Sequence, residues 1–358
     1  MLQPLASASA LVYEPHPFGL PEAREAVADD YARRGISIAP DRIVLTASTS
    51  EAYSFLFRLL CAPVEDCVMV PVPSYPLFEH LTRLDGTLAV PYRLEYHGRW
   101  GLDLHSVDAA WSKSVRALLA VSPNNPTGSV LTASELNELS DRCADREAAL
   151  IVDEVFADYP LEIAPCSISS FEPRTSNPES RTPGPEPRTA SRALTFRLGG
   201  LSKSAGLPQV KLGWIAVDGP DVRVKQALEH LELICDTYLS VSTPVQVGAR
   251  ALIRAGAAVR TRILERVRTN YLTLRTLATS HPAIEVLHAD AGWSAVLRVP
   301  AARREEDLIL ELLERNDVVV HPGFFFDFAH EAFLIVSLLP EPGIFAEGVR
   351  RAMEHVGA

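Results

Sequence analysis

Short apolar runs bounded by turn residues alternate with longer stretches of helical periodicity through most of the chain. This alternation is typical of α/β proteins, in which strands and helices follow one another. The apolar runs predict strands at 42–48, 67–75, 115–125, 148–155, 193–198 and 212–217. Helical periodicity predicts helices at 50–60, 133–145 and about 221–238. Several strands end in polar residues, so we expect those ends to meet in one crevice, where open α/β sheets bind ligands.

The pattern changes after about residue 250, where a long helix is predicted at 251–280. Three further strands follow, mixed with two helices, at 293–299, 317–323 and 332–339. We predict a large domain at 14–250 and a small C-terminal domain at 251–358, with residues 1–13 as a candidate addition to the small domain. The segment 171–191 is rich in Pro, Ser, Thr and Glu, and we expect it to be an exposed, mobile insertion in the large domain.

Composition limits the classes of function. A chain of 358 residues is long enough for two domains. The net charge of −11 and the pI near 5.4 argue against a nucleic-acid partner, because phosphate backbones require clustered Lys and Arg. No apolar run reaches the roughly 18–20 residues that span a bilayer, and the N-terminus carries no basic signal region. The five cysteines contain no CxxC pair, so we interpret them as reduced thiols and expect a cytoplasmic protein without a membrane partner.

The most informative residue is Lys203, which lies in a loop of Gly, Ser and apolar residues after a predicted strand. A lysine is ordinarily a hydrated surface cation. A desolvated amine near a second cation has a lowered pKa and becomes a nucleophile toward aldehydes. Lys211 supplies such a cation, so Lys203 is a candidate for a Schiff base.

Two other stretches strengthen this hypothesis. Asn124 and Asn125 follow a strand and enter a Pro-Gly turn, where a side-chain amide can donate to a ring substituent, although the same sequence also fits an ordinary turn. Asp153 ends an apolar strand, where a carboxylate requires a partner. A protonated pyridine nitrogen is such a partner, because the ion pair keeps the ring able to accept electrons.

A third stretch, at 46–53, is a strand-to-helix turn rich in hydroxyl groups. Its hydroxyls and the free backbone N–H groups of the helix start can hold a phosphate, to which Lys211 can add a full charge. Helix capping by Ser48, Thr49 or Ser50 is the simpler interpretation, and the two are compatible.

Four motifs resemble a known family. NNPTG at 124–128, DEV at 153–155, SKSAGLP at 202–208 and KLGW at 211–214 occur in the order and spacing of the fold type I pyridoxal-phosphate-dependent aminotransferases of class I/II. The resemblance covers nearly the whole chain from Tyr13 onward. It implies an α/β fold with a three-layer α/β/α large domain on a mostly parallel mixed sheet, and a smaller α+β C-terminal domain. It also implies pyridoxal 5'-phosphate as the cofactor.

The resemblance assigns roles to the residues that face the cofactor ring. Lys203 would hold the cofactor as a Schiff base and later move the proton between the substrate Cα and the cofactor. Asp153 would pair with the pyridine nitrogen, and Asn125 would donate to the ring 3-oxygen. Tyr75 resembles the aromatic residue that stacks on the ring.

The resemblance also implies a phosphate site, made by Ser48, Thr49, Ser202 and Lys211. Tyr13 matches a tyrosine that reaches the phosphate of the neighbouring subunit, which implies a homodimer with shared active sites. Members of the family generally carry several dozen more residues before this tyrosine. The short start therefore leaves two alternatives, a shortened segment or a truncated chain.

The sequence departs from the family pattern at four positions. Phe156 stands where a tyrosine usually donates to the 3-oxygen, Lys211 stands where Arg is common, and Gly200 stands where many relatives have Ser. Ile335 stands where an Arg usually binds the substrate carboxylate, and an alkyl group does not replace a guanidinium. Either another cation such as Arg298 binds the carboxylate, or the substrate is not an ordinary α-amino acid.

These observations predict an aminotransferase that moves an amino group between an amino acid or amine and a keto acid. Two alternatives stay open. One is a pyridoxal-phosphate-dependent lyase or decarboxylase on the same fold, which Ile335 and Phe156 suggest. The other is a cofactor-binding module with little catalysis.

Overall fold

The computed structural model describes residues 2–162 and 191–357. Most of the predicted insertion at 171–191 lies outside the described residues, as does Cys166. The other four cysteines, Cys61, Cys67, Cys143 and Cys235, are buried free thiols. No helix among the described residues is long and apolar enough to cross a bilayer.

The described residues form a large sheet of eight strands in the order β1-β8-β7-β6-β5-β2-β3-β4. The strands are β1 (Ile43–Thr46), β2 (Cys67–Val72), β3 (Leu88–Tyr96), β4 (Trp100–Leu102), β5 (Val115–Val121), β6 (Ala149–Asp153), β7 (Thr195–Gly200) and β8 (Gly213–Asp218). The central pairs β3/β2, β2/β5, β5/β6 and β6/β7 are parallel, whereas β8 runs antiparallel to both β7 and β1. The sheet is therefore mixed and mostly parallel, and it contains all six strands that the apolar runs predicted for this part of the chain.

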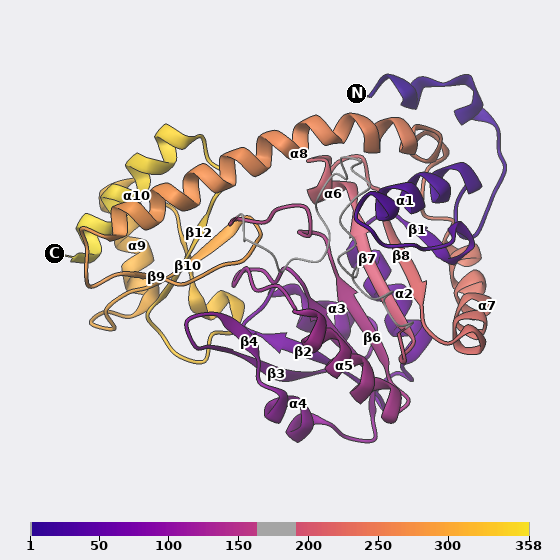
Figure 1. The fold of residues 1–358 in the computed structure, drawn as a ribbon, viewed down its shortest axis with the longest axis horizontal. Helices are drawn as coiled ribbons and strands as arrows, with labels where there is room; N and C mark the ends of the chain where they lie inside the picture. Colours follow the sequence, from indigo (N-terminus) through magenta and orange to yellow (C-terminus); the bar gives the residue numbers. More distant parts are fainter. Residues whose placement is uncertain (1, 163–190, 358) are drawn as a thin grey trace, which may run out of the picture.

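Helices cover both faces of this sheet (Figure 1). They are α1 (Pro21–Arg33), α2 (Thr49–Leu60), α3 (Leu77–Leu84), α4 (Leu104–Ala110), α5 (Ala133–Asp145), α6 (Leu201–Ser204) and α7 (Asp221–Tyr238), with a 3-10 turn η3 at Pro40–Arg42. One core joins α2 and α7 to the sheet, and two others join α4, α5 and α1 to it. The expected three-layer α/β/α arrangement is confirmed. Elements α1, α3, α4, α6, β3 and β4 were not predicted. Strand β3 lies near the sheet edge, and its mostly exposed or half-buried residues form no continuous apolar run.

Helix α8 (Thr243–Ala278) crosses from the large sheet to the small C-terminal part of the molecule (Figure 1). It begins earlier than the predicted start at residue 251, because Ser242 precedes the helix and Pro244 occupies its first turn, where proline is tolerated. A single helix therefore passes through the predicted domain boundary at 250/251, and the boundary stays a prediction.

The small part is an antiparallel sheet of four described strands with helices on one face. Its elements are β9 (Glu285–Val286), β10 (Ser294–Arg298), α9 (Glu305–Asn316), β11 (His321–Pro322), η4 (Gly323–Phe326), β12 (Phe333–Ser337) and α10 (Pro342–Gly357). The predicted strand at 317–323 is wrong except for its last residues. Asp317 adopts a left-handed conformation that ends α9, and the Val318 amide donates to the Leu312 carbonyl oxygen, so strand pairing begins only at His321.

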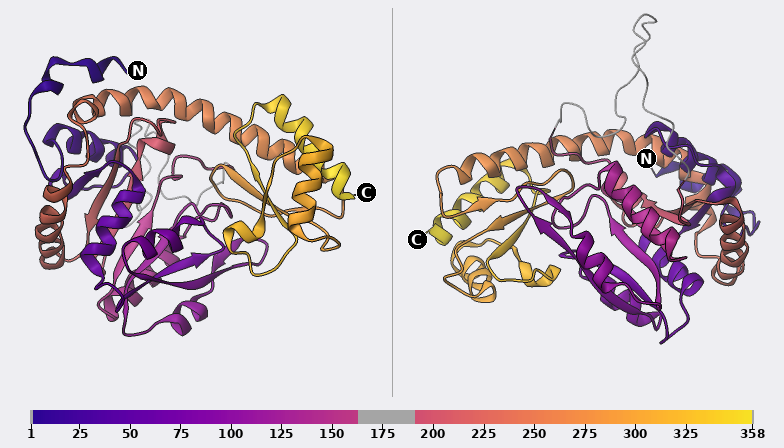
Figure 2. Two further views of the ribbon diagram at one scale, coloured as in Figure 1. Left: turned by 180° about the vertical axis from the view of Figure 1, so that it is seen from behind. Right: turned by 60° about the horizontal axis from the view of Figure 1, so that its bottom comes forward.

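The N-terminal residues form two short 3-10 helices, η1 (Gln3–Ala6) and η2 (Ala8–Leu11). They lie along the first turns of α8 (Figure 2), where Leu5 packs against the core that α1 and α8 share. A Cβ added to Gly248 of α8 would lie 3.0 Å from Leu5, so the glycine permits this close packing.

Candidate active site

The ends of five strands of the large sheet lie along one edge. Asp153 ends β6 and pairs in register with Val121 of β5 and Leu198 of β7. Gly200 ends β7 opposite Gly213, the first residue of β8, which in turn pairs with Thr46 at the end of β1. The segments that leave these ends carry Asn125, Lys203 and Ser48. Residues far apart in the sequence therefore converge as the strand pattern predicted.

Asp153 is 6% exposed and both of its oxygens are hydrogen-bonded. The Tyr53 hydroxyl donates to Oδ2 at 2.5 Å, and the Val155 amide donates to Oδ1 at 3.0 Å. Burial raises the pKa of Asp153, against the opposing effects of these two hydrogen bonds and of the Lys203 charge. Each oxygen keeps a second lone pair that can accept a proton from a bound group.

Lys203 lies in the single turn α6 that follows β7. Its Nζ is 5.5 Å from the ring centre of Trp293 and 5.9 Å from that of Phe156. Burial lowers the pKa of this amine, and the negative charge of Asp153 opposes the shift. The lowered pKa favours the neutral amine that a Schiff base requires.

A hydrogen bond from Tyr159 fixes the backbone of Lys203. The Tyr159 hydroxyl donates to the Lys203 carbonyl oxygen at 2.5 Å, and the Tyr159 ring packs edge-on against Trp293 with centroids 5.1 Å apart. Trp293 therefore connects the small sheet, where it precedes β10, to the loop that carries the amine. Part of the candidate site is built by the C-terminal region.

The two asparagines of the NNPTG motif have different roles in the structure. Asn124 is buried, and its amide contacts Ser74, Pro73 and Thr127, so it holds two loops together. Asn125 is half-buried and accepts only a long contact of 3.4 Å from Ser294 among the described residues. Asn125 is therefore the asparagine whose side chain is open to a ligand.

Tyr75 is 43% exposed and packs edge-on against Phe78, with ring centroids 6.3 Å apart. Phe78 also packs against Tyr53, at 5.5 Å. Burial, with the nearby Asp153 charge, raises the pKa of Tyr75. Tyr75 is thus partly exposed and near enough to Asp153 for the carboxylate charge to act on it, and its stacking role stays a prediction.

The predicted phosphate residues lie at neighbouring chain segments. Ser48 caps α2, where its side chain accepts from the Glu51 amide, and Thr49 begins the helix. A Cβ added to Gly213 would lie 3.2 Å from the Thr49 amide nitrogen, which shows how closely the start of β8 approaches the helix N-terminus. Lys211 is exposed and left-handed, at φ +61°, two residues before this contact. The backbone two residues after Lys211 therefore lies beside the first amides of α2, and a role of the Lys211 charge at this helix N-terminus stays a prediction.

Tyr13 is not part of this group. It is 81% exposed and lies in a groove of about 70 Å³ between the N-terminal segment, Leu45 and the residues after α7. Its predicted role concerns a neighbouring subunit and stays a prediction.

Ile335 does not face a ligand-sized polar space. It is 3% exposed in an apolar cluster that includes Trp100, Val296 and Phe326. Arg298 follows Val296 by two residues on the same face of β10, but it is exposed and forms an ion pair with Glu285.

Arg298 is also four residues along β10 from Ser294, the residue that contacts Asn125. That separation corresponds to about 13 Å of strand. The structure therefore gives no support to Arg298 as the substitute for the missing carboxylate-binding arginine.

The sequence analysis missed Tyr53, Tyr159 and Trp293. Tyr53 lies within an apolar helical stretch and was indistinguishable there from a core residue. Tyr159 is three positions beyond Phe156, and Trp293 comes from the C-terminal part of the chain, so only the tertiary structure brings them to Lys203.

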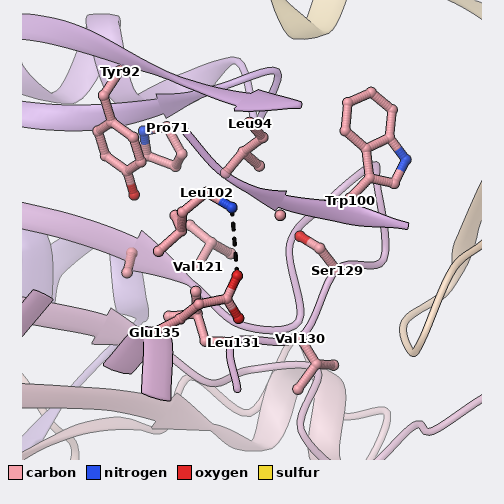
Figure 3. Close-up of a pocket in the computed structure, with 12 residues that line it drawn as sticks. Pro71, Tyr92, Leu94, Trp100, Leu102, Val121, Ser129, Val130, Leu131 and Glu135 are labelled. Carbon is pink, nitrogen blue, oxygen red and sulfur yellow. Dashed lines mark hydrogen bonds between the residues drawn. The ribbon is translucent and has the colours of Figure 1, made fainter. Parts of the chain in front are cut away.

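A separate small hollow lies beside β3 and β4 (Figure 3). Tyr92, Pro71, Leu94 and Leu102 line it, with the Leu102 amide 3.5 Å from Oε1 of Glu135. Its volume of about 10 Å³ holds at most a single water molecule. It contains no predicted site residue and is not a substrate site.

The sequence matches the family model described as aminotransferase class I and II over residues 5–345. The chain belongs to this family. The enzymes of the class I and II family depend on pyridoxal phosphate, so the predicted family and cofactor are confirmed.

Two relatives match different shares of the chain. Glutamate–glyoxylate aminotransferase 2 of Arabidopsis thaliana is 37% identical over 145 residues, which are 38% of this chain and 30% of the relative. The chain thus matches less than a third of that relative's length. Glutamate-pyruvate aminotransferase AlaA of Haemophilus influenzae is 23% identical over 89% of this chain and 77% of its own.

Solved structures of class I and II aminotransferases share the fold. Tyrosine aminotransferase from Leishmania infantum superposes with a TM-score of 0.83 at 20% identity, covering 99% of this chain and 85% of its own. Alanine aminotransferase from Pyrococcus furiosus superposes with a TM-score of 0.80 at 22% identity, covering 96% of this chain and 83% of its own. The expected fold class is therefore confirmed.

The described residues fit pyridoxal phosphate. Asp153 is a buried carboxyl group with lone pairs left for a pyridinium N–H, and Lys203 is an amine with no ion pair among the described residues. The α2 N-terminus with Lys211 provides donors for a dianionic phosphate. Acid, amine and anion site therefore occur together, and the assignment of individual site residues remains a prediction.

Proposed function

We propose that the chain is a pyridoxal-phosphate-dependent aminotransferase that moves an amino group between an amino acid or amine and a keto acid. The observation that supports this most directly is the position of Lys203 beside Asp153. The charge of Asp153 acts on the Lys203 amine, and Asp153 is buried while Lys203 is half-buried. When bound, the cofactor supplies an aldehyde that condenses with amines and a ring that accepts electrons.

In this proposal Lys203 has two tasks, which are to hold the cofactor and to carry a proton. Its lowered pKa favours the neutral form of the amine, which would take a proton from the substrate Cα and return it to a neighbouring carbon. Phe156 and Trp293 limit the access of water to the amine, and Tyr159 fixes its backbone. Asp153 accepts the ring N–H and so keeps the ring positively charged.

The other residues orient the cofactor. We propose that Asn125 donates to the ring 3-oxygen and that Tyr75 stacks on the ring. We assign the phosphate to the first turn of α2, with Ser48 and Thr49, and to Ser202 and Lys211. Phe156 provides no hydroxyl, so Asn125 alone of the described polar side chains is assigned to the 3-oxygen.

Relatives named for alanine, glutamate and pyruvate make these compounds the first donors and acceptors to test. No arginine stands at position 335 and Arg298 does not replace it, which makes amines without a carboxylate the second class. Neither a lyase or decarboxylase nor a binding module with little catalysis is favoured by a contact among the described residues.

The decisive experiment follows the absorbance of the purified chain with pyridoxal phosphate. We expect a Schiff-base absorption band in the wild type that is lost in Lys203→Ala, and formation of pyridoxamine phosphate when an amino donor is added without an acceptor. An unaltered band in Lys203→Ala contradicts the assignment of Lys203. Product release without pyridoxamine phosphate would support the lyase alternative.

We further propose a cytoplasmic homodimer. The four buried free thiols suit a reducing compartment. The exposed Tyr13 and its apolar neighbours Leu11 and Val12, which are 89% and 58% exposed, suit an N-terminal segment that a second copy covers.

A further inference from the structure

We propose that Tyr53 is a positioning residue for Asp153. Its hydroxyl donates to one carboxylate oxygen, fixes the rotation of the carboxyl group and keeps that group ionised, so that a ring nitrogen bound to Asp153 holds its proton. This inference rests on the proposed function, and it adds to that function the group that sets the ring's protonation.

The geometry gives Asp153 one donor for each oxygen. Tyr53 reaches Oδ2 at 2.5 Å from helix α2, and the Val155 amide reaches Oδ1 at 3.0 Å from the chain that follows β6. Tyr53 is 3% exposed and Asp153 is 6% exposed, so water does not replace either donor. Two donors from different segments leave the carboxyl group no freedom to rotate.

Packing alone does not explain the Tyr53 hydroxyl. The ring of Tyr53 lies between Phe57 and Phe78, with centroids 6.0 Å and 5.5 Å away, where a phenylalanine would fill the same space. Among the described residues, the hydroxyl makes its hydrogen bond to Asp153. Buried hydroxyls require partners, and the carboxylate is the partner here.

The charges around Asp153 make this hydrogen bond important. Burial and the neighbouring Glu154 raise the pKa of Asp153, whereas Tyr53, Val155 and Lys203 oppose that rise. Burial and the Asp153 charge also raise the pKa of Tyr53 well above its ordinary value, so Tyr53 stays a neutral donor. Burial and the Asp153 charge also raise the pKa of Tyr75.

The first test uses the chain without cofactor. Because burial raises the pKa of Asp153, the folded state binds more protons than the unfolded state between the ordinary and the raised value, and stability falls as pH rises through that interval. Tyr53→Phe should raise the pKa of Asp153 further, so the loss of stability with rising pH becomes larger. We expect the unfolding equilibrium constant of Tyr53→Phe, relative to wild type, to increase by about tenfold between a pH near the ordinary pKa of an aspartate and a pH above the raised pKa.

Tyr92→Phe is the matched control. Tyr92 is 1% exposed, and its hydroxyl donates at 2.9 Å to the carbonyl oxygen of Leu119, which does not titrate. We therefore expect Tyr92→Phe to lose the same amount of stability at both pH values. If Tyr53→Phe shows the same pH dependence as Tyr92→Phe, the proposal is overturned.

A second pair of variants covers the case in which Tyr53→Phe does not fold at neutral pH. In Asp153→Asn the titrating carboxyl group is absent, so adding Tyr53→Phe should produce a loss that does not depend on pH. If the double variant folds at a pH at which Tyr53→Phe alone is unfolded, the proposal is supported. If the double variant and Tyr53→Phe are both unfolded, the proposal is contradicted, because the hydroxyl is then needed for packing alone.

The second test uses nitrogen-15 NMR of the holoenzyme with the cofactor labelled at its ring nitrogen. We expect the shift of a protonated ring in wild type and in Tyr92→Phe, and a displacement toward the neutral pyridine value in Tyr53→Phe. An unchanged shift in Tyr53→Phe refutes the proposal. If wild type binds no cofactor, the proposed function fails, while the cofactor-free comparison still tests the link between Tyr53 and Asp153.

Discussion

Gly128 joins the NNPTG loop to the C-terminal region, and replacing it tests how the site is assembled. It adopts φ +70°, and its carbonyl oxygen accepts from the amides of Asp290 and Ala291, both at 3.0 Å. A Cβ at this position would lie 2.6 Å from the Cβ of Ala289 and 2.7 Å from the carbonyl oxygen of Ala291. Real Cβ atoms do not approach so closely, so the two segments must move apart in Gly128→Ala.

The magnitude has two parts. An alanine in a left-handed conformation costs about 1 kcal/mol. Overpacking against backbone and a short side chain adds about 1–3 kcal/mol. We therefore expect Gly128→Ala to lower the free energy of unfolding by about 2–4 kcal/mol, as measured by the urea midpoint at constant m.

Gly98→Ala separates the two parts. Gly98 also has a positive φ, +79°, but nothing lies within 4 Å of its added Cβ. This control should lose only the backbone contribution, about 1 kcal/mol. We also expect Gly128→Ala, but not Gly98→Ala, to bind pyridoxal phosphate more weakly, because Trp293 and Ser294 follow the displaced segment. Equal losses of stability in the two variants would refute the assigned clash.

Two further predictions concern buried charge and assembly. Arg197→Met should destabilise the chain by about 3 kcal/mol, because Arg197 forms a buried ion pair with Glu154 at 2.5 Å and the buried Glu154 carboxylate loses that charge partner. Arg192→Met, which breaks exposed ion pairs with Asp141 and Asp145, should leave the urea midpoint nearly unchanged in the same titration. The proposed homodimer should sediment at twice the chain mass of 39.1 kDa, and a single species of monomer mass at micromolar concentration would rule it out.

The sequence by itself determined the class of fold, and it located the two residues to which we assign the chemistry. The apolar runs located the strands of the central sheet, because a strand buried on both faces needs an apolar residue at nearly every position. The motifs around Lys203 and Asp153 could be identified because each lies in a short continuous segment. Helix α7 was predicted with its bounds for the same reason, since its pattern is local.

The tertiary structure alone decided what surrounds these residues. Tyr53 reaches Asp153 from a helix a hundred positions earlier, and Trp293 reaches Lys203 from the C-terminal part of the chain. Neither contact leaves a local pattern, because a buried tyrosine or tryptophan in an apolar stretch looks like any core residue. Contacts between distant segments carry no signature in a single sequence, and so the protonation and enclosure of the site emerge only from the fold.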